Sequence, residues 1–243
     1  MIYYIDYDNI PSLEPVNACI GYFDGVHRGH QQLLQNTVNF KKENGHRTAV
    51  ITFDKSAAEL FSPDKKHPCL TDIDQKIALF EKYGIDDVYI FHFDQKFASM
   101  DGKNFEKLLN KMNVHTLTCG TDFSYGDKGS MKASDLLDSK ERNFLLEIVE
   151  IKTLYGKKIS STRIRNEVEK GNIRLAERLS GHPLTVKGEI RDNHLITANV
   201  VPENGTFLTR IDGNSEQIVF QDFEGQLYHN DGKVVLEIVE RLH

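Results

Sequence analysis

The chain has 243 residues, enough to bury a sizeable core in one large domain or two small ones. Its net charge of -6 excludes a global basic field for nucleic acid, so anionic substrates have to be bound by locally placed Lys and Arg. No apolar run approaches ~18 residues and no basic-then-apolar leader begins the chain, so we expect no membrane span and a cytoplasmic location.

Strand and helix patterns alternate along the first three quarters of the chain. Strand patterns cover residues 17–21, 47–53, 87–93, 114–119 and 145–151, and helical patterns cover residues 28–42, 72–83, 104–112 and 163–179. This alternation predicts an α/β fold with a doubly wound parallel sheet. In such sheets ligands bind beyond the carboxyl ends of the strands, and three of these ends carry polar or aromatic motifs.

The pattern changes after residues 182–183. Short strand patterns follow at 184–190, 194–201, 207–211, 217–220, 226–228 and 234–239, separated by Asx-Gly and Glu-Gly turn dipeptides. We therefore expect two domains, residues 1–182 and 183–243, the second a small antiparallel β barrel or sandwich.

The three cysteines, Cys19, Cys69 and Cys119, are odd in number and no pair has metal-binding spacing. A disulfide framework or zinc site is therefore not expected. Cys19 and Cys119 lie in apolar runs, where cysteine behaves as a small core residue.

The first motif is residues 21–30 (GYFDGVHRGH), which follow a predicted strand and open a helix. Free backbone N–H groups at a helix start favour phosphate, and Gly29 allows a close backbone approach. His27 and His30 can donate hydrogen bonds to charge that develops on a phosphate in transfer. Surface histidines in a polar turn are the plain alternative, and metal binding is weaker because no third ligand has suitable spacing.

The second motif is residues 159–165 (ISSTRIR). Its hydroxyls can cap the following helix and leave N–H groups for phosphate, while Arg163 and Arg165 add cationic donors. A plain helix cap with solvated arginines is the alternative.

The third motif is residues 120–126 (GTDFSYG), in which aromatic and small residues alternate after a strand. Such a loop suits a planar ring ligand, although its aromatics can equally fill the core. The lysines Lys55, Lys65 and Lys66 predict only a solvated surface.

These three motifs, in this order and spacing, make the sequence similar to the bacterial bifunctional riboflavin kinase/FAD synthetase family, with the match running over residues 17–183. The resemblance implies an N-terminal FMN adenylyltransferase domain of the nucleotidyltransferase class and a C-terminal β-barrel riboflavin kinase. Residues 171–183 resemble the family's bridge between the two.

The resemblance also implies site roles. His27, His30 and Arg165 would be catalytic, and Phe53, Phe123 and Tyr125 would contact flavin, with Phe53 the weaker candidate. The residues implied to bind ATP are Gly21, Phe23, Asp24, Gly29, His30, Gly120, Asp122, Ser160, Ser161, Thr162 and Arg165. The implied reaction joins FMN and ATP, with Mg²⁺, to give FAD and pyrophosphate. No protein metal site, nucleic acid or membrane partner is implied.

Two departures from the family pattern leave alternatives open. Residues 52–57 (TFDKSA) lack the usual His-Pro pair after the second strand, so another phosphorylated acceptor remains possible. The motif at residues 195–199 (LITAN) keeps Thr-Ala-Asn but lacks the preceding proline and glycines, and the tail is short for the family's barrel. We therefore expect a truncated, kinase-inactive remnant, with a non-catalytic regulator or a retained kinase as the alternatives.

Overall fold

Six parallel strands form the central sheet in the order β1-β4-β3-β2-β5-β8. Their bounds are Ile2–Ile5 (β1), Val16–Ile20 (β2), Arg47–Phe53 (β3), Asp87–Phe91 (β4), Val114–Gly120 (β5) and Leu145–Val149 (β8). The chain winds outward from β2 to β4 on one side, then returns to β5 on the other. The carboxyl ends of β2 and β5 therefore flank the switch point at which open α/β sheets bind ligands.

The structure is a computed structural model that describes all residues from Met1 to His243, and its chain divides into two compact units. The sheet belongs to the first unit, which comprises Met1–Phe23, Gly29–Lys66 and Ile77–Ile151. The second unit comprises Asp24–Arg28, His67–Lys76 and Lys152–His243.

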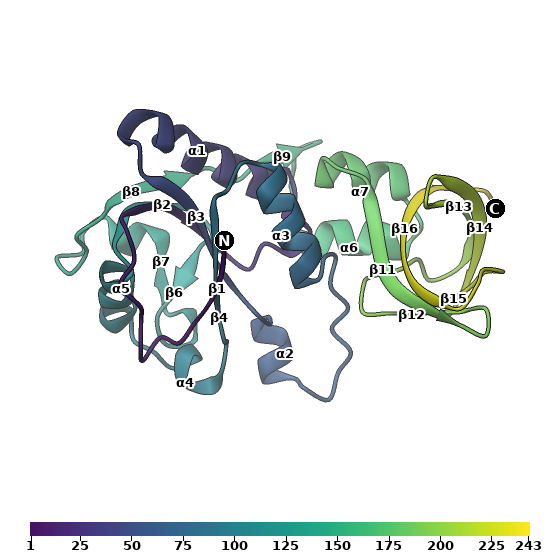
Figure 1. The fold of residues 1–243 in the computed structure, drawn as a ribbon, viewed down its shortest axis with the longest axis horizontal. Helices are drawn as coiled ribbons and strands as arrows, with labels where there is room; N and C mark the ends of the chain where they lie inside the picture. The colour runs from purple at the N-terminus through teal and green to yellow at the C-terminus, as the bar shows by residue number, and fades with distance from the viewer. The chain divides into compact units, whose positions relative to one another are not determined.

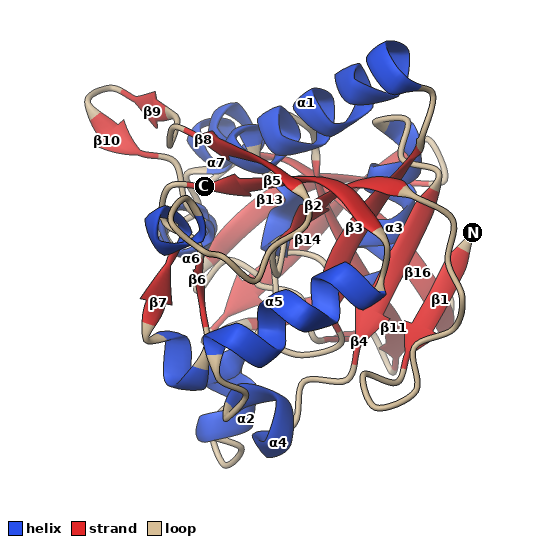
Figure 2. Cartoon of the chain, turned by 90° about the vertical axis from the view of Figure 1, so that its left-hand side faces the viewer, coloured by secondary structure: helices blue, strands red, loops and turns tan.

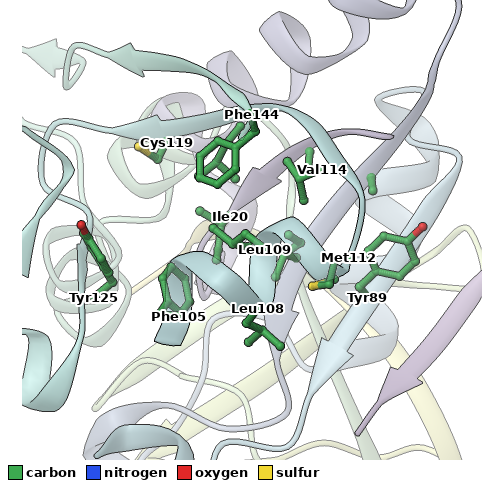
Figure 3. Packing of buried hydrophobic residues seen from close by; sticks show 14 of the residues in the cluster. Ile20, Tyr89, Phe105, Leu108, Leu109, Met112, Val114, Cys119, Tyr125 and Phe144 are labelled. Atoms are coloured by element: carbon green, nitrogen blue, oxygen red, sulfur yellow. The ribbon is translucent and has the colours of Figure 1, made fainter. Parts of the chain in front are cut away.

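Helices cover both faces of the sheet, as the doubly wound prediction requires (Figure 2). On one face, Leu108 and Leu109 of α5 (Gly102–Lys111) and its C-cap residue Met112 pack against buried strand residues such as Ile20 and Val114 (Figure 3). Successive strand side chains point to opposite faces. The intervening residues, including Cys19 and Val50, are therefore buried on the other face, where α1 (Arg28–Asn44) supplies Leu34.

Up to residue 158 the remaining elements of the chain are short, except α3 (Ile73–Lys82) between β3 and β4. They are α2 (Ala57–Phe61), α4 (Gln95–Ala98), β6 (Ser124–Tyr125), β7 (Met131–Lys132), β9 (Thr153–Leu154), β10 (Lys157–Lys158), and the 3-10 turns η1 (Asp24–Val26), η2 (Asp127–Gly129) and η3 (Ala133–Leu136). Cys19 and Cys119 are buried thiols, as predicted, and all three cysteines are free.

The predicted helix over residues 163–179 is wrong as a single element. The structure has α6 (Ser161–Glu169) and α7 (Ile173–Ser180), separated by Gly171 at φ +77°. A Cβ on Gly171 would lie 3.0 Å from the Phe207 ring, so both the backbone conformation and the packing require glycine there. The helical pattern in the sequence continues past this glycine, but the helix itself ends before it.

The C-terminal strands form a closed antiparallel barrel in the order β11-β12-β15-β14-β13-β16 (Figure 1). Their bounds are Leu184–Arg191 (β11), His194–Thr197 (β12), Gly205–Ile211 (β13), Asn214–Gln221 (β14), Glu224–Gln226 (β15) and Gly232–Arg241 (β16). The barrel, not the sandwich, is therefore the correct alternative. Although the segment is short, β11 pairs with β16 and closes the barrel.

Apolar side chains fill the barrel at alternating strand positions. Ile218 and Phe220 of β14, and Val234, Leu236 and Ile238 of β16, are buried among them. The barrel begins at Leu184, just after Gly181 ends α7 in the left-handed conformation at φ +82°. The expected domain boundary after residue 182 stays a prediction, because the second compact unit also includes residues that precede it. None of the helices is both long enough and apolar enough to cross a bilayer.

Candidate active site

The first motif forms a tight turn after β2 in which three residues have positive φ. These are Phe23 (φ 57°), Gly25 (φ 76°) and Val26 (φ 35°). For the two non-glycine residues, each such conformation costs on the order of 1–3 kcal/mol and persists only where the surroundings impose it. The Phe23 ring meets Phe80 edge-on at 5.4 Å and His30 at 5.1 Å, which holds the start of the turn.

Gly25 has two reasons to be glycine. Besides its positive φ, a Cβ there would lie 2.7 Å from Leu70 Cδ1. Its backbone N–H donates to Thr71 Oγ1 at 2.8 Å, and its carbonyl oxygen lies 2.9 Å from His182 Nε2. Sequence reasoning did not single out Leu70 or Thr71, and it named His182 only within the bridge between the domains, because nothing local marks a residue that supports a turn over 40 positions away.

Asp24 is the centre of this support. Its carboxylate is 3% exposed, and Oδ1 accepts from the backbone N–H groups of Leu70 (2.8 Å) and Thr71 (3.2 Å). Oδ2 accepts from Arg165 Nη2 at 2.8 Å, and the backbone carbonyl accepts from Ser161 Oγ at 2.8 Å. Burial raises the Asp24 pKa, while the Arg165 charge and these hydrogen bonds oppose the rise. The Asp24 carboxylate is thus directed at protein donors rather than at a solvent-facing ligand site.

The second motif begins α6 as predicted. Ser160 caps the helix, its Oγ accepting from Arg163 N at 3.3 Å, and Thr162 is exposed. Arg163 Nη1 donates to the carbonyls of Leu154 (3.0 Å), Lys157 (3.0 Å) and Lys158 (3.3 Å). Arg163 Nη1 therefore holds the hairpin of β9 and β10, and the expectation that Arg163 also donates to phosphate stays a prediction.

Arg165 makes fewer hydrogen bonds to the protein than Arg163 does. One nitrogen is engaged by Asp24, but its Nε is buried without a hydrogen-bond partner, and its side chain is 30% exposed. His27 is buried at 6% exposure just before α1, and Gly29 and His30 lie in the first turn of that helix. Within the second unit, the fold thus brings together Asp24, Ser161 and Arg165 from motifs that are over 130 residues apart.

A cavity of about 500 Å³ opens at the carboxyl ends of β2, β3 and β5 in the first unit. We call it the aromatic cavity. Of the predicted site residues it is lined by Gly21, Phe23, His30, Phe53, Gly120, Asp122, Phe123 and Tyr125. Because these strand ends flank the switch point of the sheet, the cavity lies where the sequence predicted a ligand site.

The third motif forms one wall of the aromatic cavity. Phe123 stacks on Tyr125 with ring planes 7° apart and centroids 6.0 Å apart. The Tyr125 hydroxyl donates to Glu106 Oε1 at 2.9 Å, and burial together with this carboxylate raises the Tyr125 pKa. Tyr125 belongs to the core and also lines the cavity, so its aromatic ring fills the core as one reading expected, while binding of a planar ring ligand stays a prediction. A Cβ on Gly120 would lie 2.8 Å from Asp122 Oδ1, so a side chain there would require the Asp122 carboxylate to move.

The lining of the cavity also contains two aromatic residues that sequence reasoning missed, Phe93 and Phe97. Phe53 packs against Phe93 at 5.4 Å and Phe97 at 5.5 Å, and all three line the cavity. Phe97 belongs to α4, whose N-cap Asp94 accepts from Phe97 N at 2.7 Å. A four-residue helix is too short to show a periodic pattern, so only its Asp cap offered a signal.

The segment that departs from the family pattern after β3 also reaches the cavity. Lys55 and Ala57 line it, together with Phe61 of α2. Ser56 begins α2 with a reciprocal capping box, in which its Oγ accepts from Glu59 N at 3.2 Å and the Glu59 carboxylate accepts from Ser56 N at 3.2 Å. A capped helix thus occupies the place where the family's His-Pro pair was expected.

No group of three or more His, Cys, Asp and Glu side chains is arranged to hold a metal ion. Among the residues that line the aromatic cavity, Asp122 is the sole carboxylate.

Comparison with known proteins identifies the family. Residues 10–163 match the family model described as FAD synthetase. The chain is 32% identical over 213 residues to the bifunctional riboflavin kinase/FMN adenylyltransferase of Listeria monocytogenes, which covers 81% of this chain and 68% of that protein. With the protein of the same name from Bacillus subtilis it is 34% identical over 216 residues, covering 81% and 67%.

One solved structure is similar over the whole chain. It is the crystal structure of a macrolide-efflux protein from Streptococcus pneumoniae, with a TM-score of 0.87 at 22% identity, covering 100% of this chain and 91% of that one. At this identity the likeness supports the fold alone. The family match and the two relatives, together with the motifs that surround the aromatic cavity and the Asp24–Arg165 pair, establish that this chain belongs to the FAD synthetase family.

Proposed function

We propose that this chain is an FMN adenylyltransferase that transfers AMP from ATP to FMN, giving FAD and pyrophosphate. The observation that carries the proposal is the aromatic cavity at the switch point of the sheet, which begins at the glycine-rich turn after β2. Its volume of about 500 Å³ is within the range of small-molecule sites. The family membership and the names of both relatives point to the same reaction.

The flavin ring is assigned to the aromatic part of the cavity. Phe53, Phe123 and Tyr125 present ring faces or edges there, and planar aromatic ligands pack well against such surfaces. The altered segment after β3 contributes Lys55 and Phe61 to the same cavity, so the loss of the His-Pro pair does not remove the wall on that side.

In the proposed reaction an oxygen of the FMN phosphate attacks the α-phosphorus of ATP. The new P–O bond forms as the bond to the bridging oxygen breaks, and pyrophosphate leaves with that electron pair. No covalent enzyme intermediate is needed, so the chain contributes positioning and electrostatic stabilisation. His27, His30 and Arg165 are the proposed donors to the phosphate charge.

The other proposed ATP contacts are backbone groups of the turn and of the α6 start. Gly21, Gly29 and Gly120 allow close approach of the nucleotide. Ser160 and Thr162 supply hydroxyl groups at the helix start, and Ser161, whose hydroxyl donates to the Asp24 carbonyl, supplies its backbone N–H. Phe23, Asp24 and Asp122 are proposed to shape this nucleotide site, Asp24 through its hydrogen bonds to the protein.

Mg²⁺ is proposed to arrive with ATP. Mg²⁺ keeps several waters and is commonly held by substrate phosphates with one or two carboxylates, which suits a cavity lined by the single carboxylate of Asp122. When bound, it would neutralise charge on the phosphate oxygens.

We also propose that adenylyl transfer resides in residues 1–182 and that residues 183–243 are a truncated, kinase-inactive riboflavin-kinase-like domain. The side chains that remain of its Thr-Ala-Asn motif support this proposal. Thr197 Oγ1 donates to Lys187 O at 2.7 Å, and the Asn199 amide is hydrogen-bonded within the protein, so both are committed to structural bonds.

The deciding experiment incubates the purified chain with ATP, Mg²⁺ and either FMN or riboflavin, and resolves the flavin products by chromatography. We expect FAD from FMN and no product from riboflavin. His30→Ala should depress turnover, whereas His115→Ala, at the amino end of β5, should not. Absence of FAD from FMN would reject the adenylyltransferase, and FMN from riboflavin would reject the kinase-inactive barrel.

A further inference from the structure

The loop after β12 of the barrel is joined to the segment His67–Lys76 by backbone hydrogen bonds. Cys69 N donates to Ala198 O at 3.0 Å, and Val200 N donates to Cys69 O at 2.8 Å, which makes a parallel bridge between Cys69 and Asn199. Both segments that form this bridge belong to the second compact unit. The segment is therefore held along the barrel by its main chain.

The Asn199 side chain reinforces this junction from a site that is 5% exposed. Its Oδ1 accepts from Lys187 N of β11 at 2.8 Å, and its Nδ2 donates to Gln75 Oε1 at 3.0 Å. Gln75 in turn donates from Nε2 to Thr185 O at 3.1 Å. One amide thus connects the barrel wall with the segment, and the segment connects back to the wall.

Further ties act at the surface of the same junction. The Lys187 ammonium forms ion pairs with Asp72, at 3.1 Å, and with Asp74. These two carboxylates flank the start of α3, close to Gln75. Exposed ion pairs of this kind contribute less than buried hydrogen bonds, so Asn199 is the stronger tie.

The other side of the segment holds the turn Asp24–Arg28. Leu70 N and Thr71 N donate to the Asp24 carboxylate, and Thr71 Oγ1 accepts from Gly25 N at 2.8 Å. Leu70 follows Cys69 directly, so the residue bridged to Asn199 is next to the residue that binds Asp24. The division of the chain agrees with this continuity, because it assigns Asp24–Arg28 to the compact unit of the barrel.

We propose that Asn199 is a positioning residue for the Asp24–Arg28 turn, acting through Cys69, Leu70 and Gln75. The Asn of the former kinase motif thereby serves the adenylyltransferase site. The role in catalysis rests on the proposed function, in which this turn and Arg165 receive the ATP phosphates. The barrel is then a required part of the nucleotide site rather than a passive remnant.

The test compares Asn199→Ala with Thr209→Val in the full chain. Thr209 is a matched control because it is also buried in the barrel, but its hydroxyl donates to Glu216 O at 3.2 Å and makes no bond to the segment. We expect Asn199→Ala to raise the KM for ATP by about 2- to 30-fold, with the KM for FMN little changed. Thr209→Val should leave the KM for ATP unchanged, although its melting temperature should be similar to that of Asn199→Ala.

Two further variants distinguish the contributions of the individual bonds, and they provide a test even if Asn199→Ala does not fold. Asn199→Asp retains the acceptor for Lys187 N but cannot donate to Gln75, so it should resemble Asn199→Ala. Lys187→Met removes only the surface ion pairs and should raise the KM for ATP less than Asn199→Ala does. If Asn199→Ala does not fold, a wild-type KM for ATP in both of these variants overturns the proposal.

Amide hydrogen exchange provides a readout that does not depend on turnover. In Asn199→Ala the amides of Gly25, Leu70 and Thr71 should exchange faster than in Thr209→Val, because the bonds that protect them are loosened. Equal exchange in the two variants would overturn the positioning role even in an active enzyme. If the wild-type chain makes no FAD, the adenylyltransferase proposal fails, while this exchange comparison still decides whether Asn199 positions the turn.

Discussion

Arg165 Nη2 and Asp24 Oδ2 lie 2.8 Å apart, but the two side chains of this pair differ in exposure, at 30% for the guanidinium and 3% for the carboxylate. The carboxylate is an internal anchor that also accepts two backbone N–H groups. The Arg165 side chain, by contrast, is partly exposed. An arginine held at one nitrogen by a buried carboxylate has its orientation set before substrate binds, which is the condition for effective stabilisation of transferring phosphate.

Arg165→Gln should therefore lower both stability and activity. The loss of the pair removes the stronger of the two cations, Arg165 and Lys76, that favour the buried Asp24 carboxylate, and we expect the free energy of unfolding to fall by about 1–3 kcal/mol. FAD formation should fall by about 100-fold. Urea titration and a pyrophosphate release assay measure the two effects.

Arg174→Gln is the control for that prediction. Arg174 forms an ion pair with Glu240 at 2.7 Å, but it is 82% exposed, so the change in stability should lie within about 0–1 kcal/mol.

The loss of stability in Arg165→Gln should also grow as pH rises. Burial raises the pKa of Asp24 and Arg165 opposes that rise, so without Arg165 the folded chain holds the Asp24 proton more strongly and loses stability as the carboxyl ionises. A pH-independent loss would contradict this account.

Gly25→Ala should destabilise the chain more than Gly213→Ala. Both glycines have left-handed φ, +76° and +83°, so both variants carry a similar backbone strain of about 1–2 kcal/mol. Only at Gly25 does the added Cβ meet another atom, Leu70 Cδ1 at 2.7 Å, whereas nothing lies within 4 Å at Gly213. The difference in melting temperature between the two variants measures the packing contribution, and equal melting temperatures would show that Leu70 moves without cost.

Phe123→Ala should weaken flavin binding selectively. The half-buried Phe123 ring lines the aromatic cavity and stacks on Tyr125. We expect the KM for FMN to rise by about tenfold, and the KM for ATP to change little, because stacking on an aromatic side chain is worth about 1–3 kcal/mol. Phe223→Ala, at a half-exposed phenylalanine after β14, should alter neither constant. Equal increases for both substrates in Phe123→Ala would place this ring elsewhere in the reaction.

Asp94 should give a pH-dependent contribution to stability. Asp94 accepts a hydrogen bond from the backbone N–H of Phe97, and this bond holds the Asp94 pKa below its usual value. Burial acts in the opposite direction, and the hydrogen bond from the Tyr7 hydroxyl at 3.1 Å lowers the pKa further. Folding thus favours the ionised carboxylate. The stability that Asp94 contributes is therefore present above about pH 4 and is lost as pH falls through the pKa of Asp94 in the folded chain.

Two substitutions test the Asp94 prediction. Asp94→Ala should cost about 0.5–2 kcal/mol at neutral pH and less in acid, because the cap of α4 is lost. Asp94→Asn keeps a capping oxygen but cannot ionise, so its stability should show a smaller acid dependence than that of the wild type. Chemical unfolding at pH 7 and at pH 3 measures both variants. A constant difference between Asp94→Ala and the wild type across this range would contradict the assigned pKa shift.

The elements with strong local patterns could be predicted from sequence. The β3 strand begins and ends where its apolar, β-branched run predicted, and Ser160 caps α6 as its hydroxyl predicted. The β1 strand was missed because Ile2–Ile5 lies at the sheet edge with exposed positions, so it lacks the continuous apolar run of a central strand. The break at Gly171 was missed because a glycine within a helical pattern is either tolerated or ends the helix, and the positive φ that distinguishes the two is seen only in the structure.

The sequence by itself determined the alternation of strands and helices, the glycine positions of the turns, and the three motifs that bear the family resemblance. These are local properties, since propensity, capping and spacing act over a few residues. Only the tertiary structure decided that Asp24 meets Arg165 across 141 positions, that Phe97 faces Phe53, and that Asn199 reaches Gln75. Such contacts depend on strand order and on barrel closure, which bring together side chains that no local pattern relates. For this reason Arg163 and Arg165, two residues apart in one motif, hold different partners: backbone carbonyls for one and a buried carboxylate for the other.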